Sequence, residues 1–261
     1  MKITSLYSWI FVFLAACVPA LAGTARAASF DGAARLDIAD TSQTLTWNPT
    51  VNAQTVSCWF KFVIPSGVSL SQNMVIVANR TNATWNASNQ MVENHAYNIF
   101  FNINTGDVDF STRGTSGFFT KTLVDSPYLE RWYHVAVVRN GNTFSGYVDG
   151  RLVFQEVSAV GDSRSSAGVS IGGLASGHYL RGEVIEFQHV AGTTSRSTLL
   201  ANRFRDLDAS GDPNFRGYFK LAFSANSANQ LKNYGNNPGP GTDPAVKQGS
   251  GAITFEVVNR D

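Results

Sequence analysis

The segment from Thr81 to Tyr97 combines one tryptophan with many amide side chains, a composition suited to sugar recognition. Binding sites for small ligands pair aromatic rings with a few well-placed polar groups. Trp85 can supply the ring, and the predicted ligand-binding residues are Trp85, Asn89, Asn94 and Tyr97. The alternative is that Trp85 folds back onto the core, because tryptophan is highly buried on average. The sequence leaves both interpretations of Trp85 open.

A second group of residues has the oxygen-rich spacing of a calcium loop. Asp206, Asp208, Ser210 and Asp212 follow one another at every second position, and calcium prefers clustered carboxylate and carbonyl oxygens. The Glu that closes such a loop is absent at the expected distance. A polar turn, in which Asp side chains accept backbone N–H groups, explains the same residues. Calcium at these four residues is therefore an expectation, and the only cofactor that the sequence suggests.

Acidic residues do not form the arrangement that glycoside hydrolysis requires. A retaining glycosidase places two carboxylates about 5–5.5 Å apart, which on a strand calls for positions of the same face. Glu183 and Glu186 are three residues apart, so an unbroken strand points them to opposite faces. Asp107 and Asp109 share a face, but they follow a predicted turn and have no third carboxylate partner. The sequence therefore predicts a protein without enzymatic activity.

The first 27 residues have the features of an export signal. A positive start is followed by an apolar run from Ile10 to Leu21, and Ala25-Arg26-Ala27 fits a cleavage site. The mature chain is then expected to begin at Ala28, without a transmembrane helix, and to be secreted or displayed at the cell surface. The alternative is a lipoprotein anchored to a membrane through Cys17, because Leu14-Ala15-Ala16-Cys17 matches a lipobox.

The charge of the expected mature chain disfavours nucleic-acid binding, and its cysteine content excludes an internal disulfide. The 20 Lys and Arg fall to 18 without Lys2 and Arg26, against 19 Asp and Glu, so the expected mature chain carries a formal charge of −1. A nucleic-acid-binding surface needs a basic stripe, which this balance disfavours. Cys58 is then the only cysteine, so it forms no internal disulfide, and its apolar strand predicts an inert core thiol.

Short alternating segments separated by turn residues predict strands throughout the mature chain. Residues 131–153 read as three consecutive antiparallel strands joined at Asn140-Gly141 and Asp149-Gly150. In the strand from Gln54 to Val63, alternation places Val56, Cys58, Phe60 and Phe62 on one face. In the strand from Gly182 to Val190, the same rule places Ile185 and Phe187 on one face.

The C-terminal third departs from this pattern. Residues 194–207 predict one short helix with a hydroxyl residue at its start. Residues 226–251 are rich in Gly, Pro and Asn and predict a long polar loop. Residues 252–258 alternate as a closing strand, which we expect beside the first strand of the fold.

Several segments, in order, resemble the laminin G-like branch of the concanavalin A-like lectin/glucanase superfamily. They are Ser29-Phe30-Asp31-Gly32, Thr55 to Lys61, Trp132 to Gly150, Ile171-Gly172-Gly173 and Arg181 to Phe187. The resemblance implies an all-β fold, a two-sheet antiparallel jelly-roll sandwich with one short helix, formed by residues 28–261. It also implies domains that bind glycans or protein surfaces, often with a calcium ion at one edge.

These observations favour an exported, non-catalytic binding or adhesion module that recognises a glycan or a cell-surface component. One alternative is a structural or assembly subunit that makes protein contacts through sheet edges and the 226–251 loop. A divergent glycan-acting enzyme is disfavoured by the missing carboxylate pattern. The ligand and the oligomeric state do not follow from the sequence.

Overall fold

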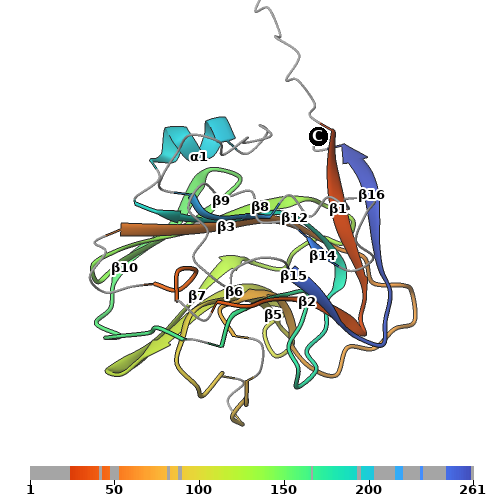
Figure 1. Ribbon diagram of the computed structural model, residues 1–261, viewed down its shortest axis with the longest axis horizontal. Coiled ribbons are helices and arrows are strands. Elements are labelled where there is room, and N and C mark those ends of the chain that lie inside the picture. Colours follow the sequence, from red (N-terminus) through yellow and green to blue (C-terminus); the bar gives the residue numbers. More distant parts are fainter. Residues whose placement is uncertain are drawn as a thin grey trace, which may run out of the picture.

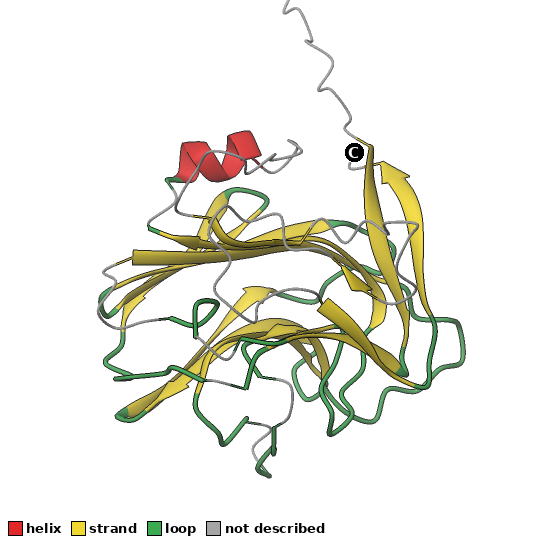
Figure 2. Cartoon of the chain, in the orientation of Figure 1, coloured by secondary structure: helices red, strands yellow, loops and turns green. Residues whose placement is uncertain are grey.

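The computed structural model describes residues 24–40, 43–47, 53–80, 83–87, 90–165, 167–192, 195–202, 215–219, 230–231 and 245–259. These residues form two antiparallel sheets stacked face to face, as Figures 1 and 2 show. The predicted all-β jelly-roll sandwich is confirmed. The one helix among them, α1 (Arg196–Asn202), lies on the outer side of the upper sheet in both figures.

The upper sheet, here called sheet A, has the order β10 (Arg151–Val157), β9 (Thr143–Val148), β8 (Tyr133–Asn140), β3 (Ala53–Phe62), β12 (Arg181–Ala191), β1 (Thr24–Asp31) and β16 (Ile253–Asn259), with β13 (Phe215–Phe219) also paired to β12. The lower sheet, sheet B, has the order β14 (Gln230–Leu231), β15 (Ala245–Gly249), β2 (Ala34–Ile38), β11 (Val169–Ile171), β4 (Met74–Ala78), β5 (His95–Asn102), β6 (Asp107–Gly114) and β7 (Gly117–Val124).

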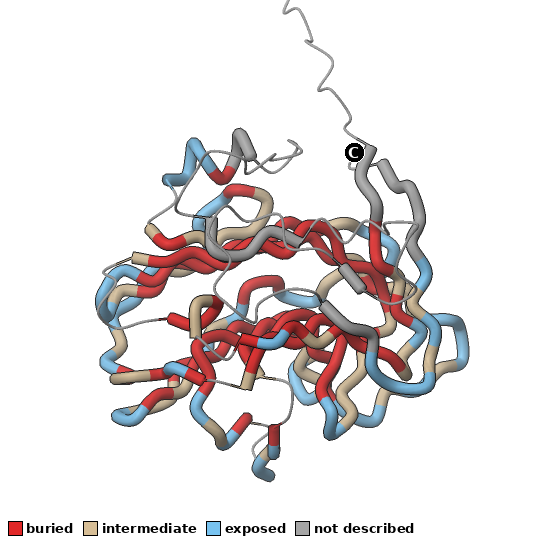
Figure 3. Tube along the Cα trace, viewed as in Figure 1, coloured by how far each residue is buried: buried red, intermediate tan, exposed pale blue. Residues whose placement is uncertain are grey.

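The core fills the space between the sheets, where the buried positions of both layers face each other (Figure 3). The expected face of β3 is confirmed, because Val56, Cys58, Phe60 and Phe62 all belong to this core. Cys58 is fully buried, and desolvation raises the pKa of its thiol to about 12. The thiol is therefore protonated at neutral pH and fits the inert role expected of it.

The three-stranded meander at residues 131–153 is also confirmed as β8, β9 and β10. Asp149 and Gly150 both have positive φ, at 50° and 76°, as a tight turn of this type requires. The Asp149 carboxylate accepts a hydrogen bond from the backbone N–H of His134 at 3.0 Å. Asp149 thus holds the turn against the start of β8.

The face assignment in β12 is wrong from Glu186 onward. The pairing of β12 with β3 slips between Ile185 and Gln188, and Glu186 has a positive φ of 52°. This bulge turns the Phe187 side chain into the core, whereas the Ile185 side chain packs with Trp59 in a separate cluster on the outer face of sheet A. A bulge inserts one residue into a strand, so the strict alternation on which the prediction relied no longer holds.

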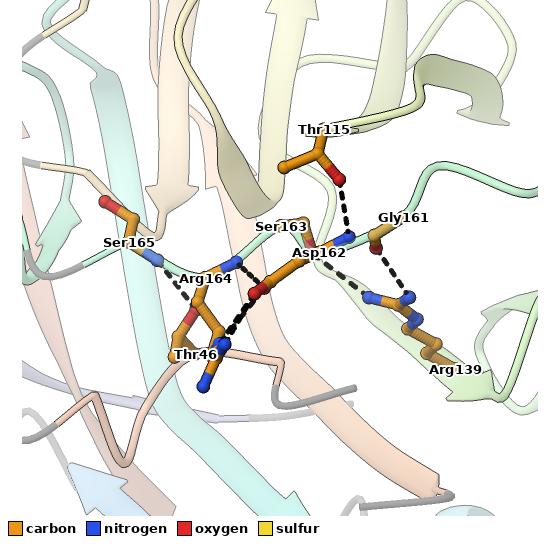
Figure 4. A network of polar contacts seen from close by, with 8 residues as sticks. All are labelled: Thr46, Thr115, Arg139, Gly161, Asp162, Ser163, Arg164 and Ser165. Atoms are coloured by element: carbon orange, nitrogen blue, oxygen red, sulfur yellow. Dashed lines mark hydrogen bonds and ion pairs between the residues drawn. The ribbon is translucent and has the colours of Figure 1, made fainter. Parts of the chain in front are cut away.

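The buried Arg139 side chain of β8 forms hydrogen bonds to the segment 158–165 (Figure 4). Arg139 is 7% exposed and donates hydrogen bonds to Gly141 O at 3.0 Å, Ser163 Oγ at 3.0 Å and Gly161 O at 3.2 Å. Its guanidinium also lies 5.4 Å from the ring centroid of Phe144. Asp162 turns outward and pairs with the exposed Arg164, with 2.6 Å between Oδ2 and Nη2. The 158–165 segment is therefore fixed to β8 by Arg139.

The C-terminal segments differ in part from the expectation. Ser195 Oγ accepts a hydrogen bond from the Thr198 N–H at 3.1 Å, so a hydroxyl does cap the helix. The loop interpretation of 226–251 is wrong for residues 230–231 and 245–249, because β14 pairs with β15 and β15 pairs with β2. β16 lies antiparallel to β1, in a register that starts at Thr24↔Asn259. β1 thus begins within the predicted signal segment. In the ranges given above, no helix is long and apolar enough to cross a membrane.

Candidate functional site

A small hairpin formed by residues 83–87 and 90–92 lies against the outer face of sheet B. Trp85 pairs with Met91, the Val92 N–H donates to Thr84 O at 3.0 Å, and the Asn86 N–H donates to Gln90 O at 2.9 Å. Figure 1 shows this golden segment below sheet B, on the side away from sheet A. Residues 83–87 and 90–94 are called the hairpin segment below.

Polar contacts hold the hairpin segment in place at its two ends. The Thr84 N–H donates to both carboxylate oxygens of Glu93 at 2.9 Å, and Arg80 donates to Asn94 O at 2.8 Å. Partial burial works to raise the pKa of Glu93, but the Thr84 hydrogen bonds outweigh it and hold the pKa below its usual value. Glu93 is therefore a carboxylate at neutral pH and anchors the first hairpin strand.

His95 fixes the point where the hairpin segment enters β5. Its Nδ1 lies 2.8 Å from Glu93 O, and its Nε2 lies 3.1 Å from Ser111 Oγ on the neighbouring strand β6. His95 is fully buried, and this burial lowers its pKa to about 4. The ring is therefore neutral at pH 7, and the contact with Glu93 O assigns the proton to Nδ1.

Trp85 is partly buried. This is intermediate between the two interpretations of the sequence, an exposed ligand-binding ring and a ring folded back onto the core. Its ring centroid is 5.1 Å from that of Phe100 on β5 and 4.9 Å from that of His178. It packs against a cluster on the outer side of sheet B that includes Phe100, Met91 and Leu174. The ring is thus held in a fixed orientation while part of it stays accessible to solvent.

Next to Trp85, sheet B presents polar side chains on the same outer face. Asp109 lies directly opposite Phe100, and its carboxylate accepts hydrogen bonds from Asn102 Nδ2 and Thr122 Oγ1, both at 2.9 Å. One row along, Asn98 Nδ2 donates to Ser111 Oγ at 3.3 Å. We call these five residues the polar rows of sheet B: Asn98, Asn102, Asp109, Ser111 and Thr122.

The polar rows keep some hydrogen-bonding capacity that the protein does not use. Asn98 Oδ1 and Trp85 Nε1 are both buried and have no hydrogen-bond partner within the protein. Asn102 is half-buried and Thr122 is exposed, so a ligand can reach both side chains from solvent. A fixed aromatic ring beside such polar groups can bind a molecule that has both an apolar face and hydroxyl groups.

The structure places the predicted ligand-binding residues in different environments. Trp85 and Asn94 do lie in the hairpin segment, and Asn94 is exposed. Tyr97 is in the core: it is fully buried, and its hydroxyl donates to Leu45 O at 2.7 Å. The prediction for Tyr97 is wrong because neighbouring residues of a strand face opposite sides, so that Asn98, not Tyr97, faces outward. Asn89 lies outside the described residues.

The predicted calcium residues, Asp206, Asp208, Ser210 and Asp212, also lie outside the described residues. Elsewhere, within the part of the chain that the structure describes, no group of three or more His, Cys, Asp or Glu side chains is arranged to hold a metal ion. Calcium binding at residues 206–212 therefore stays a prediction.

Sequence reasoning missed the polar rows. Asp109 was weighed as a catalytic carboxylate, although Asn102 and Thr122 already occupy both of its oxygens. The usable signal is the run Asp107, Asp109 and Ser111, which alternates with the apolar Val108 and Phe110 and so marks a polar outer face.

Comparison with known proteins agrees with this fold. A family model described as the concanavalin A-like lectin/glucanases superfamily matches residues 30–198. The chain belongs to this superfamily. No curated protein sequence matches the chain. Within the superfamily fold, the match covers the hairpin segment, both rows of polar residues and the meander of sheet A.

Solved structures that are similar to the chain share little sequence identity with it. A protein from Bacteroides ovatus, provisionally assigned as carbohydrate binding, has a TM-score of 0.62 at 15% identity, covering 90% of this chain and 60% of its own. This chain thus spans three fifths of that protein. A carbohydrate-binding module (CBM40) of a Ruminococcus gnavus sialidase has a TM-score of 0.48 at 13% identity, covering 68% and 96%. At these identities the likeness concerns the fold alone.

Proposed function

We propose that the protein binds a glycan on the outer face of sheet B and does not hydrolyse it. The observation that carries this proposal is the position of Trp85: its ring is fixed between Phe100 and His178, and Phe100 is the cross-strand neighbour of Asp109 in the polar rows. A sugar presents an apolar C–H face to the ring and hydroxyl groups to Asn102 and Thr122. The fold shared with a provisionally assigned carbohydrate-binding protein supports the same class of ligand.

The charges around this face favour a neutral glycan. The Asp109 carboxylate is occupied by Asn102 and Thr122, and the Glu93 carboxylate by Thr84. Arg113 donates to Met91 O at 3.0 Å and lies 4.9 Å from the ring centroid of Phe118. An acidic sugar needs a cation that can turn toward it, and a basic sugar needs an available carboxylate. The groups here are already engaged with the protein.

The same contacts support a binding role without catalysis. A glycosidase needs one carboxylic acid that can release a proton and a second carboxylate close to it. Asp107 shares the outer face with Asp109, but its Oδ1 accepts the Ser126 N–H at 3.1 Å. Both side chains therefore serve as hydrogen-bond acceptors within the fold, and neither is placed as a free acid.

Replacing Trp85 by alanine is expected to weaken glycan binding by about thirtyfold or more, because truncating a central aromatic contact typically costs at least 2 kcal/mol. The measurement is isothermal titration calorimetry with neutral hexasaccharides from cellulose, xylan, mannan, laminarin and arabinan. Trp85→Phe, which keeps an aromatic ring against Phe100, is expected to lose less. Thr122→Val removes only a hydroxyl and is expected to weaken binding severalfold.

Val92→Ala is the matched control, since Val92 is 41% exposed in the same hairpin segment and is not among the contacts of the site. Circular dichroism and thermal melting establish that each variant is folded. Unchanged affinity in folded Trp85→Ala and Thr122→Val proteins would rule out this face as the binding site.

A further inference from the structure

The loop that joins β7 to β8, residues 125–132, is held by three hydrogen bonds to neighbouring elements. The Ser126 N–H donates to Asp107 Oδ1 at 3.1 Å, the Tyr128 N–H to Tyr133 Oη at 2.9 Å, and the Glu130 N–H to Phe62 O at 2.9 Å. The loop thus has a defined conformation, tied to strands of both sheets.

This conformation is strained at two positions. Ser126 and Glu130 have positive φ values of 44° and 58°, in the left-handed region that residues with a Cβ atom adopt at a cost. Strained backbone persists only where surrounding contacts hold it in place. It is concentrated at functional sites. Between these two positions, the loop exposes Tyr128 and Leu129, by 71% and 52%. The fold therefore holds a tyrosine ring in solvent on a strained, locked loop.

Beyond Tyr128, the loop continues to a second aromatic side chain on the outer face of sheet A. Trp132 is partly buried, and Lys61 Nζ lies 5.1 Å from its ring centroid. Lys61 also lies 3.2 Å from Glu183 Oε1 and 3.8 Å from Glu130 Oε2. Glu130 thus connects the Tyr128 loop to the Lys61 and Trp132 side chains.

The polar groups of this cluster indicate the class of ligand. Lys61 is shared by the carboxylates of Glu130 and Glu183, and Arg131 pairs with Asp149 at 3.8 Å, so each charged group already faces one of opposite sign. Glu183 is 6% exposed, and its second oxygen, Oε2, has no hydrogen-bond partner within the protein. An acceptor without a donor, next to aromatic rings and internally paired charges, fits a neutral polyhydroxyl ligand rather than an ion.

We propose that Tyr128, with Trp132, Lys61 and Glu183, forms a second saccharide-binding site, so that the protein binds two neutral glycan segments at once. Tyr128 stacks on a sugar ring, and Glu183 Oε2, which is buried in the free protein, accepts a hydroxyl of the sugar once the side chains that cover it move aside. This site shares no residue with the hairpin segment or the polar rows. Two sites on one chain raise the apparent affinity for a polymer through effective concentration.

The test is the stoichiometry of calorimetric titration with the same five neutral hexasaccharides. Wild-type protein is expected to bind two molecules of the recognised sugar per chain, Tyr128→Ser one, and Trp85→Ala one. Tyr128→Ser is expected to fold normally because the ring is exposed. Its matched control is Leu129→Ser, which removes a neighbouring exposed side chain and is expected to keep two sites.

A second readout uses the corresponding polysaccharide fixed to a sensor surface. Tyr128→Ser is expected to lower apparent affinity by at least about a hundredfold, the low end of the loss when a bivalent contact becomes monovalent. One site that Trp85→Ala abolishes and Tyr128→Ser leaves intact would overturn the second site and keep the first. One site that only Tyr128→Ser abolishes would overturn the hairpin site instead. Failure of all five sugars to bind wild-type protein would overturn both.

Discussion

Replacing Arg139 by methionine is expected to lower the free energy of unfolding by about 3 kcal/mol. The guanidinium is 7% exposed and donates to two backbone carbonyls and one hydroxyl, at 3.0–3.2 Å. Methionine fills much of the same volume but leaves Gly141 O, Gly161 O and Ser163 Oγ without these donors. Ser163 is fully buried, and a buried acceptor that loses its donor costs about 1–3 kcal/mol, whereas the two carbonyls are only partly buried and add less. For a domain of this size, the melting temperature should fall by about 10 °C.

Urea unfolding followed by circular dichroism measures this loss. The control is Arg164→Met, which removes an arginine from the same network (Figure 4), and the Arg164 side chain is 41% exposed to solvent. Its ion pair with Asp162 is screened by water, so we expect no measurable change in the unfolding midpoint. Equal stabilities of the Arg139→Met and wild-type proteins would contradict the role of Arg139 in fixing residues 158–165 to β8.

Acid is expected to destabilise the protein through His95, by about 3 kcal/mol between pH 6.5 and pH 4. Burial lowers the pKa of His95 in the folded protein from 6.5 to about 4. Nearby Arg80 and Arg113 act in the same direction, whereas Glu93 acts against them. Because the folded pKa is depressed, the unfolded chain binds the proton first as pH falls. The contribution is therefore complete above pH 6.5 and is lost progressively down to about pH 4.

Urea unfolding at pH 7.5, 5.5 and 4.5 tests this prediction in the wild type and in His95→Gln, which lacks the titrating ring. Other groups titrate in both proteins, so the difference between the two pH profiles isolates His95. The wild type should lose more stability on acidification than the variant. Parallel profiles would show that His95 does not titrate as its burial implies.

The fold follows from the sequence wherever a strand is regular and its turns are short. The alternation of β3 identified the core residues Val56, Cys58, Phe60 and Phe62, and the Asp149-Gly150 turn marked the meander. The same rule failed in β12, because nothing in the local pattern marks Glu186 as a bulged residue with positive φ. A bulge is set by how two strands pair, and this information is absent from either strand alone.

The candidate site was less accessible to sequence reasoning, because it depends on contacts between distant segments. Trp85 lies against Phe100 and His178, and no local pattern predicts that these three rings meet. The choice between Tyr97 and Asn98 required the orientation of β5, which is set by pairing with β4 and β6. Tyr128 was overlooked because its exposure results from backbone hydrogen bonds of the loop rather than from its sequence neighbours.

The most direct measurement of the central claim is a crystal structure of the protein with the neutral hexasaccharide that binds most tightly. The proposal predicts electron density for a sugar ring against the exposed part of Trp85, with hydroxyl groups within hydrogen-bond distance of Asn102 or Thr122. A complex in which the outer face of sheet B is free of sugar, at a ligand concentration that saturates binding in solution, would contradict it.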